Sequence, residues 1–230
     1  MKKILVFGAH PDDVEFGTGG LIIKEIEHGA KVKIVVCSLG EAGTNGTPEG
    51  RKIESEKAAE LMGAEIEFID LGGDSHIENT SLNAFKLANI IREYKPNIVL
   101  TTSLTENQHP DHRALAEMTR SAIRFARYGG LEELKNLPVH TVESLYYYPS
   151  SGSLDTKPDI IIDIGEQYDK WTKAMSIHES QMKTKDYINL IENRARYFGA
   201  TIGVSYAAIL WVNDPVKVDS ITLLGSSRNY

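Results

Sequence analysis

Cysteine is almost absent from this chain of 230 residues, which contains Cys37 and no other. A single cysteine excludes an internal disulfide and is typical of proteins that work in a reducing compartment. Long apolar runs are also lacking, because no stretch approaches the ~20 residues that a membrane-spanning helix needs. The apolar run at residues 4–7, behind Lys2 and Lys3, is too short for the core of a signal peptide. We therefore expect a cytoplasmic protein without a membrane partner.

Positive charge is scarce relative to negative charge, with 25 Lys and Arg against 32 Asp and Glu and a formal net charge of −7. An acidic protein repels phosphate backbones, and the sequence has no basic stripe with interleaved aromatic residues. These features exclude nucleic acid as an expected partner. Hydrophobic residues form 41% of the chain, enough for a sizeable core, and the length fits one domain over residues 1–230.

Short apolar runs alternate with helical patterns through the first half of the chain. The runs predict strands at residues 4–7, 32–36, 66–69 and 98–102. Helical spacing, with capping or terminating residues at the ends, predicts helices at residues 14–27, 51–62, 82–94 and 111–126. This alternation is typical of an α/β fold with a Rossmann-like, doubly wound and mainly parallel sheet.

The second half of the chain is less regular. It predicts strands at residues 142–148 and 160–164 and helices at residues 166–178 and 187–198. The last thirty residues mix short strand-like runs with turns, and their pattern predicts no order of elements. We therefore expect a less regular C-terminal part beside the doubly wound half.

Side chains that can bind a metal gather after two of the expected strands. The first strand is followed by the segment G-A-H-P-D-D at residues 8–13, and the fourth by Q-H-P-D-H at residues 108–112. In a sheet of order 3-2-1-4, the first and fourth strands are neighbours at the topological switch point, where the carboxyl ends of the strands open a crevice. The two segments should therefore meet where this fold binds its ligands.

Residue type and spacing point to zinc. His10 and Asp13 are three residues apart, as are His109 and His112, so each pair can face one way. Imidazole and carboxylate ligands suit zinc, and a catalytic site keeps three protein ligands, whereas four would make a closed, structural site. Asp12 adds a carboxylate that points in a different direction from that of Asp13 and is suited to act as a general base for a water molecule. Singly, these residues could be helix caps or surface histidines, but their pairing favours a site.

A dinucleotide-binding domain is the competing interpretation of this fold. Its fingerprint, G-x-G-x-x-G directly after the first strand, is missing, and carboxylates stand where a pyrophosphate would lie. Gly17, Gly19 and Gly20 fall inside the first expected helix, which favours close packing there. The other histidines have no metal-capable partners nearby and are not expected to be functional: His28, His76, His140 and His178.

The segments A-H-P-D-D at residues 9–13 and H-P-D-H at residues 109–112 closely resemble those of the LmbE-like (PIG-L) zinc deacetylases. The similarity extends over most of the chain, including N-G-T at residues 45–47 and E-S-Q at residues 179–181. It is greatest to the bacterial branch that includes the bacillithiol-pathway deacetylases. The resemblance implies a Zn²⁺-dependent removal of acetyl from a small N-acetylglucosamine derivative, with N-acetylglucosaminyl-malate as one candidate. It also implies a homo-oligomer, either a trimer or a hexamer.

The resemblance assigns the metal ligands and the base. His10, Asp13 and His112 match the zinc ligands of the family, and Asp12 matches its general base. Asp12 would then take the proton of a water molecule that attacks the acetamide carbonyl, and acetate and a free amine would leave.

Four further residues match positions outside this set. His109 matches a histidine that stabilises the oxyanion or protonates the leaving amine, with Asp111 as a partner that should favour the cationic form of His109. Arg51 matches a substrate-contacting arginine, and Tyr187 matches a tyrosine that closes over the site. A Gly-rich loop at residues 39–50 follows the second strand, opens at the carboxyl edge of the sheet and leads to Arg51. The guanidinium of Arg51 could therefore bind a malyl carboxylate through two hydrogen bonds.

Two other functions stay open at this point. One is a different amide hydrolase of the same superfamily, such as a thiol-conjugate amidase. The other is a non-catalytic protein that binds a sugar or a metal. Asp12 argues against the second, because binding alone requires no base.

Overall fold

The structure, a computed structural model, describes residues 1–105, 109–150, 157–183, 185–223 and 225. One sheet of seven strands has the order β3-β2-β1-β4-β5-β7-β6. The strands are β1 (Lys3–Gly8), β2 (Lys31–Val36), β3 (Glu65–Phe68), β4 (Ile98–Thr102), β5 (Ser144–Tyr148), β6 (Ile160–Asp163) and β7 (Ala207–Val212). Strands β1 to β5 are parallel to one another, whereas β7 runs antiparallel to both β5 and β6. The predicted fold class and the order 3-2-1-4 are confirmed.

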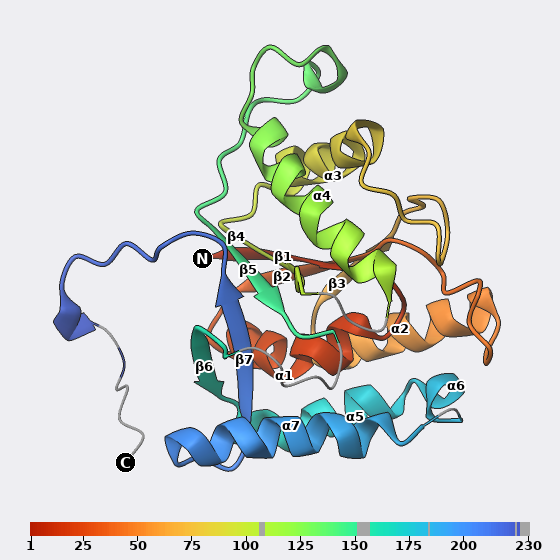
Figure 1. The fold of residues 1–230 in the computed structure, drawn as a ribbon, viewed down its shortest axis with the longest axis vertical. Coiled ribbons are helices and arrows are strands. Elements are labelled where there is room, and N and C mark those ends of the chain that lie inside the picture. Colours follow the sequence, from red (N-terminus) through yellow and green to blue (C-terminus); the bar gives the residue numbers. More distant parts are fainter. Residues whose placement is uncertain (106–108, 151–156, 184, 224, 226–230) are drawn as a thin grey trace.

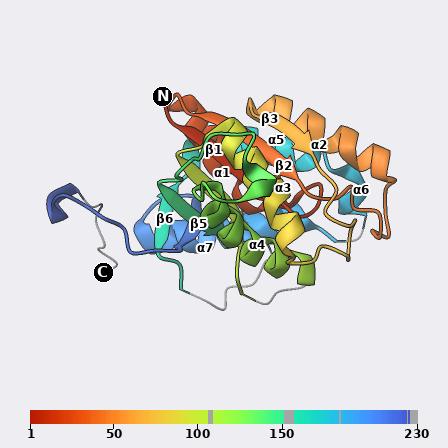
Figure 2. The same ribbon diagram turned by 90° about the horizontal axis from the view of Figure 1, so that it is seen from above.

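Helices cover both faces of this sheet (Figures 1 and 2). They are α1 (Asp13–Glu27), α2 (Pro48–Met62), α3 (Ser81–Tyr94), α4 (Pro110–Ala126), α5 (Tyr168–Ser176), α6 (Glu179–Met182) and α7 (Tyr187–Ile202). Short 3-10 turns lie at Glu132–Leu134, Gly165–Gln167 and Ile221–Leu223. Figure 1 shows α3 and α4 on one face and α1, α2, α5 and α7 on the other.

The central strand β1 supplies apolar side chains to both layers of the core. Ile4 and Val6 belong to the cluster on the α1 side, whereas Leu5 and Phe7 belong to the cluster that α3 and α4 cover. Successive side chains of a strand point to opposite faces, so a parallel strand that is buried on both faces has a continuous apolar sequence. The run at residues 4–7 therefore predicts a strand although it shows no alternation.

Two glycines let α1 approach its neighbours closely. A Cβ atom at Gly17 would lie 2.4 Å from Cδ2 of Tyr148, and one at Gly20 would lie 2.6 Å from Cδ1 of Ile164. Tyr148 is buried, and its hydroxyl donates a hydrogen bond to the carbonyl oxygen of Phe7 (2.7 Å). The close packing that the glycines predict is confirmed, and it holds the start of α1 firmly beside β1.

The structure corrects several expected boundaries. α2 begins at Pro48 and not at residue 51, because Oγ1 of Thr47 accepts a hydrogen bond from Gly50 N (3.1 Å) and caps the helix ahead of the predicted start. The helix expected at residues 166–178 is shorter, because a 3-10 turn precedes α5 and the helix ends at Ser176. α7 continues to Ile202, beyond its expected end.

The C-terminal part contains a strand that the sequence pattern did not place. β7 inserts between β5 and β6, with Tyr147 opposite Trp211 and Ile161 opposite Ile209. Neither partner is joined to β7 by a hairpin, so no turn sequence marks the pairing. Among the residues that the structure describes, no helix is both long and apolar enough to cross a membrane.

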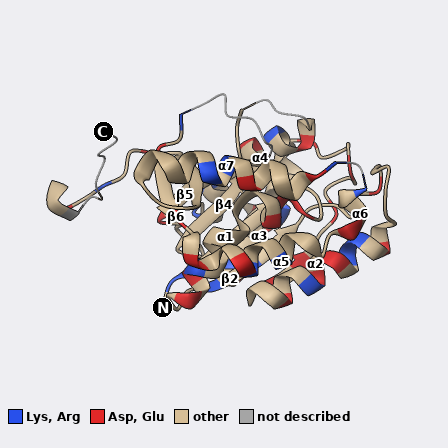
Figure 3. Cartoon of the chain, turned by 90° about the horizontal axis from the view of Figure 1, so that it is seen from below, with Lys and Arg blue, Asp and Glu red and all other residues tan. Residues whose placement is uncertain are grey.

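Surface charges of opposite sign are interspersed along α2 (Figure 3). Lys52 and Glu56, for example, approach to 3.9 Å across one helical turn, and both side chains are exposed. Exposed pairs of this kind contribute little to stability. A cluster of buried ionisable side chains, by contrast, lies at the carboxyl edge of the sheet.

Candidate active site

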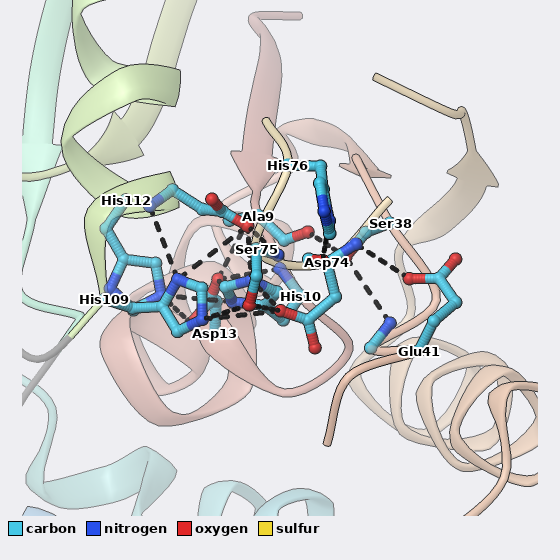
Figure 4. A network of polar contacts seen from close by, with 12 residues as sticks. Ala9, His10, Asp13, Ser38, Glu41, Asp74, Ser75, His76, His109 and His112 are labelled. Atoms are coloured by element: carbon cyan, nitrogen blue, oxygen red, sulfur yellow. Dashed lines mark hydrogen bonds and ion pairs between the residues drawn. The ribbon is translucent and has the colours of Figure 1, made fainter. Parts of the chain in front are cut away.

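The two metal-capable segments meet at the carboxyl ends of β1 and β4. β1 ends at Gly8 and α1 begins at Asp13, while His109 caps α4 in the connection that follows β4. Because β1 and β4 are adjacent, Nδ1 of His10 lies 3.3 Å from Nε2 of His112 (Figure 4). The predicted meeting of the two segments is confirmed.

The three residues predicted as zinc ligands face one another. Oδ1 of Asp13 lies 2.9 Å from Nε2 of His112, and Oδ2 of Asp13 lies 3.5 Å from Nδ1 of His10. One donor atom from each residue lies within 4.8 Å of the other two, and all three residues are buried. Two imidazoles and a carboxylate at this spacing fit the donor set of a catalytic zinc site. Their role as ligands stays a prediction.

Backbone hydrogen bonds fix the carboxylate of Asp13. Its Oδ2 accepts from the amides of Ala9 and His10, both at 2.9 Å. Burial raises the pKa of Asp13, but the charge of His112 and hydrogen bonds from both histidines outweigh burial and hold that pKa well below its usual range. Asp13 is therefore ionised, as a metal ligand must be.

The second nitrogen of His10 faces two more carboxylates. Nε2 lies 3.1 Å from Oδ2 of Asp111 and 3.3 Å from Oδ1 of Asp74. Burial lowers the pKa of His10, but hydrogen bonds to Asp111, Asp13 and Asp74 outweigh burial and raise it to about 12. The surroundings of His10 therefore favour positive charge strongly, and outer carboxylates of this kind orient a ligating imidazole.

The spacing of donor atoms also allows a second group, which shares His10. This group consists of His10, Asp74, His109 and Asp111. It would use Nε2 of His10, whereas the predicted ligand set uses Nδ1. Oδ2 of Asp111 already accepts a hydrogen bond from the amide of Ser75 (2.7 Å), which suits an orienting carboxylate better than a ligand.

His109 and Asp111 are less closely paired than the sequence predicts. Nδ1 of His109 lies 3.7 Å from Oδ2 of Asp111, beyond hydrogen-bond distance, and accepts instead from the amide of Asp111 (3.3 Å). Burial and the charge of His10 lower the pKa of His109, and they outweigh the attraction of Asp111. Asp111 does raise the pKa of His109, as the sequence predicts, but this effect is too small to set the net direction of the shift.

Asp74 is a site residue that the sequence analysis missed. It lies in the connection between β3 and α3, where Oδ1 accepts from Ser75 Oγ (3.2 Å) and lies 3.4 Å from Nε2 of His109. Hydrogen bonding from His10 lowers the pKa of Asp74 to about 2. An acidic residue after the third strand, whose carboxyl end opens at the same edge, is the signal that would have identified it.

Asp12 has an unusual backbone conformation at the mouth of α1. Its φ is 122°, a value that residues other than glycine rarely adopt, and its side chain is 16% exposed. Burial, together with the charge of Asp13, raises the pKa of Asp12 to about 6, although Arg51 and His178 pull in the other direction. A strained residue with a displaced pKa is a candidate for a catalytic role.

Arg51 is buried and holds two segments of the site together. Its Nη2 donates to the carbonyl oxygen of Pro11 (2.9 Å) and to Oδ2 of Asp12 (3.4 Å), and its Nη1 donates to the carbonyl oxygen of Gly40 (3.1 Å). The guanidinium therefore fixes the Asp12 turn to the Gly-rich loop. Direct contact between Arg51 and a substrate stays a prediction.

A cavity of about 350 Å³ opens over these residues. Asp111 lies behind the wall, and the other predicted site residues line the cavity: His10, Asp12, Asp13, Arg51, His109, His112 and Tyr187. The ring of Tyr187 stacks on Phe16, with centroids 5.8 Å apart and planes inclined by 17°. A cavity of this size beside three imidazoles and three carboxylates suits hydrolysis of a small substrate.

Comparison with known proteins supports this assignment. The profile of the family described as PIG-L, GlcNAc-PI de-N-acetylase, matches residues 5–123. Diacetylchitobiose deacetylase of Thermococcus kodakarensis is 30% identical over 224 residues, covering 90% of this chain and 81% of the relative. A 4-oxalmesaconate hydratase of Pseudomonas putida is 27% identical, covering 81% and 76% of the two chains. A probable N-acetyl-α-D-glucosaminyl L-malate deacetylase of Bacillus cereus is also 27% identical, covering 78% and 84%.

The fold agrees with these relationships. The crystal structure of a conserved protein from Thermus thermophilus superposes with a TM-score of 0.86 at 27% identity, covering 98% of this chain and 100% of the other. The profile match contains both metal-capable segments and spans just over half of the 230 residues. The predicted resemblance and the expectation of an enzyme are confirmed, which removes the non-catalytic alternative. The chain belongs to the GlcNAc-PI de-N-acetylase (PIG-L) family.

Proposed function

We propose that the protein is a zinc-dependent N-deacetylase that removes the acetyl group from a small N-acetylglucosamine derivative. The observation that carries this proposal is the set of His10, Asp13 and His112 facing one cavity, with the carboxyl group of Asp12 beside them. The family profile and two of the three relatives described above support amide hydrolysis. A cytoplasmic location and a homo-oligomer remain predictions.

His10, Asp13 and His112 would hold the zinc ion through Nδ1, a carboxylate oxygen and Nε2. When bound, zinc lowers the pKa of a water ligand to about 7 and polarises a carbonyl group. The carboxylates of Asp111 and Asp74, on the other side of His10, would fix the orientation of its ring.

Asp12 is placed to accept the proton of the attacking water. With a pKa of about 6, it is mostly ionised at neutral pH yet still close enough to that pH to transfer the proton onward to the departing amine. Arg51 holds Asp12 in place, because its guanidinium donates hydrogen bonds to the preceding carbonyl oxygen, that of Pro11, and to Oδ2 of Asp12. A base that is fixed in this way loses little entropy on reaching the transition state.

His109 is placed to stabilise negative charge on the acetamide oxygen. Because its Nδ1 accepts the amide proton of Asp111, the proton of the neutral ring is assigned to Nε2. A lowered pKa keeps this ring neutral at pH 7, so it acts as a hydrogen-bond donor through Nε2. A donor aimed at a developing oxyanion typically contributes about 10²–10³-fold to turnover.

Because the relatives catalyse different reactions, the products that the protein forms are the decisive test of its function. One relative is named a hydratase, and a thiol-conjugate amidase of the same superfamily also stays open. We would incubate the zinc-loaded protein with N-acetylglucosamine, diacetylchitobiose and N-acetylglucosaminyl-malate, and measure acetate and free amine by mass spectrometry. The proposal expects equal amounts of both products, and much less with Asp12→Asn. Acetate release from none of the three, with water addition to 4-oxalmesaconate instead, would make the protein a hydratase.

A further inference from the structure

The cavity has charged and uncharged walls. Its ionisable side chains surround the proposed metal site, whereas a separate patch is formed by Phe16, Tyr187, Leu190 and Ile191, here called the apolar wall. α7 supplies the last three of these residues, and α1 supplies Phe16. The apolar wall therefore stands beside the metal site but comes from a different layer of the molecule.

The apolar wall is packed in place. The Phe16 ring lies between Tyr187, stacked on it at 5.8 Å, and His178, whose ring centroid is 5.7 Å away. His178 is buried, and so is Ile191. A flat aromatic surface with aliphatic neighbours favours binding of the apolar face of a ring.

The cavity offers little to a carboxylate. Among the described residues that line it, Arg51 is the one side chain with a permanent positive charge. Its Nη atoms bind Gly40 O, Pro11 O and Asp12, and its Nε is buried without a hydrogen-bond partner. A Cβ atom at Gly40 would lie 1.9 Å from Nη1, which shows how closely the Gly-rich loop covers the guanidinium. The two-bond grip on a carboxylate would therefore require this loop to move.

Other cations are few in the sequence around the cavity. Three segments outside the described ranges, residues 106–108, 151–156 and 184, lie near described residues of the site in the sequence and contain no Lys or Arg. The nearest cations in sequence to the α7 part of the apolar wall are Lys183, Lys185 and Arg194, and none of them lines the cavity. The two lysines are exposed, whereas Arg194 is buried and its Nη2 donates to the carbonyl oxygen of Phe16 (2.9 Å). An anionic group that lay on the apolar wall would therefore lose its water without gaining a charged partner, which is costly.

We propose that the apolar wall binds an uncharged ring attached to the N-acetylglucosamine, so that the enzyme prefers neutral glucosaminides to carboxylated conjugates. This inference rests on the proposed function, because it places the N-acetyl group at the metal site. The sequence predicts that Arg51 binds a malyl aglycone. According to this inference, the aglycone is instead a neutral aromatic ring or a neutral sugar.

The first test compares three substrates on the zinc-loaded full-length protein. Phenyl N-acetyl-α-glucosaminide should have a kcat/KM about 10-fold above that of N-acetylglucosamine, because part of the phenyl ring leaves water on the apolar wall. N-acetyl-α-glucosaminyl-malate should be no better than N-acetylglucosamine. A kcat/KM for the malate conjugate above that of the phenyl glucosaminide would overturn the proposal and would indicate that Arg51, Lys183 or Lys185 reaches the aglycone.

A charge variant tests the location of the subsite. Leu190→Arg should lower kcat/KM for the phenyl glucosaminide about 10-fold and raise that for the malate conjugate about 10-fold, which reverses the preference. Leu82→Arg is the matched control, because Leu82 is 73% exposed on α3 and does not line the cavity. Equal shifts in the two variants would show an effect of net charge and would contradict the subsite.

Binding of the reaction products separates this inference from the proposed function. The two deacetylated products, phenyl α-glucosaminide and α-glucosaminyl-malate, can be titrated by calorimetry without any turnover. Their binding therefore reports on the apolar wall even if no substrate releases acetate. Tighter binding of the phenyl compound, weakened by Leu190→Arg and not by Leu82→Arg, would support the subsite. Tighter binding of glucosaminyl-malate would refute it, whatever reaction the enzyme catalyses.

Discussion

Arg92, on α3, and Arg51, on α2, are 1% and 4% exposed, respectively, but they bind different kinds of partner. The guanidinium of Arg92 donates to backbone carbonyl oxygens, those of Phe125, Ala126, Tyr128, Leu134 and Leu137. These carbonyls belong to the last turn of α4 and to the segment that follows it, where helix geometry supplies no intrahelical donor. Arg92 therefore fastens α3 to the end of α4.

Arg51 joins two loops at the carboxyl edge of the sheet, and one of its acceptors is the carboxylate of Asp12. Its charge therefore acts on a group that titrates, whereas the five carbonyl acceptors of Arg92 are neutral. Burial alone therefore does not mark a functional residue. A buried cation with carbonyl partners stabilises the scaffold, and a buried cation beside a strained carboxylate sets the properties of the site.

Loss of metal should be the largest effect at the carboxyl edge. Replacement of His10, Asp13 or His112 with Ala should abolish stoichiometric zinc binding, because each removes one of three buried donors. Replacement of His109 with Ala should keep the zinc and lower turnover. Elemental analysis of the purified variants measures both outcomes, and Arg92→Met serves as the scaffold control. Zinc lost from His109→Ala would assign the metal to the second group of donors.

Turnover should fall next most steeply when the base is removed. Asp12→Asn keeps the shape of the side chain but cannot accept a proton, so kcat should decrease about 10²–10⁴-fold. Zinc content should not change, because Asp12 is not a ligand in the proposed site. Steady-state kinetics with elemental analysis tests this, and near-normal turnover would remove Asp12 from the mechanism.

The two arginines should separate stability from turnover. Arg92→Met removes hydrogen bonds to five carbonyls, three of which keep a backbone amide donor, and should lower the free energy of unfolding by about 3–4 kcal/mol. It should have little effect on kcat of the folded protein. Arg51→Met should cost less stability, about 1–2 kcal/mol, and lower kcat about 10–100-fold, because Asp12 loses its positioning contact. Urea unfolding and kinetics on the same samples test the contrast.

Substrate dependence distinguishes the roles of Arg51 itself. If Arg51 positions Asp12 and the Gly-rich loop, Arg51→Met should reduce kcat/KM equally for N-acetylglucosamine and N-acetylglucosaminyl-malate. A larger loss for the malate conjugate would show that the guanidinium contacts the aglycone, as the sequence predicts. Equal stability losses in Arg51→Met and Arg92→Met would remove the distinction between site and scaffold.

Much of the site was predictable because parallel sheets have a strict geometry. Buried parallel strands have apolar sequences, and their carboxyl ends meet at one edge, so the motifs of His10 and His112 had to converge once β1 and β4 were neighbours. The same geometry places Asp74 at the carboxyl edge but does not predict its contact with His10. Its loop follows β3, which lies at the far edge of the sheet, and only the folded path of that loop brings Oδ1 to within 3.3 Å of His10 Nε2.

The environment of each residue was harder to predict than its position. The sequence pairs His109 with Asp111, but the cap of α4 turns the Asp111 carboxylate toward His10. His178 has no nearby partner in the sequence, yet it is buried behind Phe16 and acts on the charge of Asp12. These properties arise from packing between distant elements, which a local sequence pattern does not encode.

A pH-dependent change in stability is expected at Asp12. Burial raises its pKa in the folded chain to about 6, against about 3.9 for an unfolded Asp. Between these values the folded chain binds more protons than the unfolded chain, so the contribution of Asp12 to the free energy of unfolding falls as pH rises from about 4 to about 6. Asp12→Asn cannot ionise and escapes this penalty. With a chelator present throughout, the variant should match the parent near pH 4 and exceed its stability by about 1–3 kcal/mol at pH 7.

Urea unfolding of the parent, Asp12→Asn and Arg92→Met at four pH values between 4 and 7 makes the comparison complete. The difference between Asp12→Asn and the parent should grow with pH, because one ionisable group beside Arg51 has been removed. The deficit of Arg92→Met should stay constant over the same range, because carbonyl oxygens do not titrate. A constant difference for Asp12→Asn would show that its carboxyl group titrates normally in the folded chain. In that case Arg51 would stabilise the Asp12 turn much as Arg92 stabilises the end of α4, and the contrast between the two arginines would rest on turnover alone.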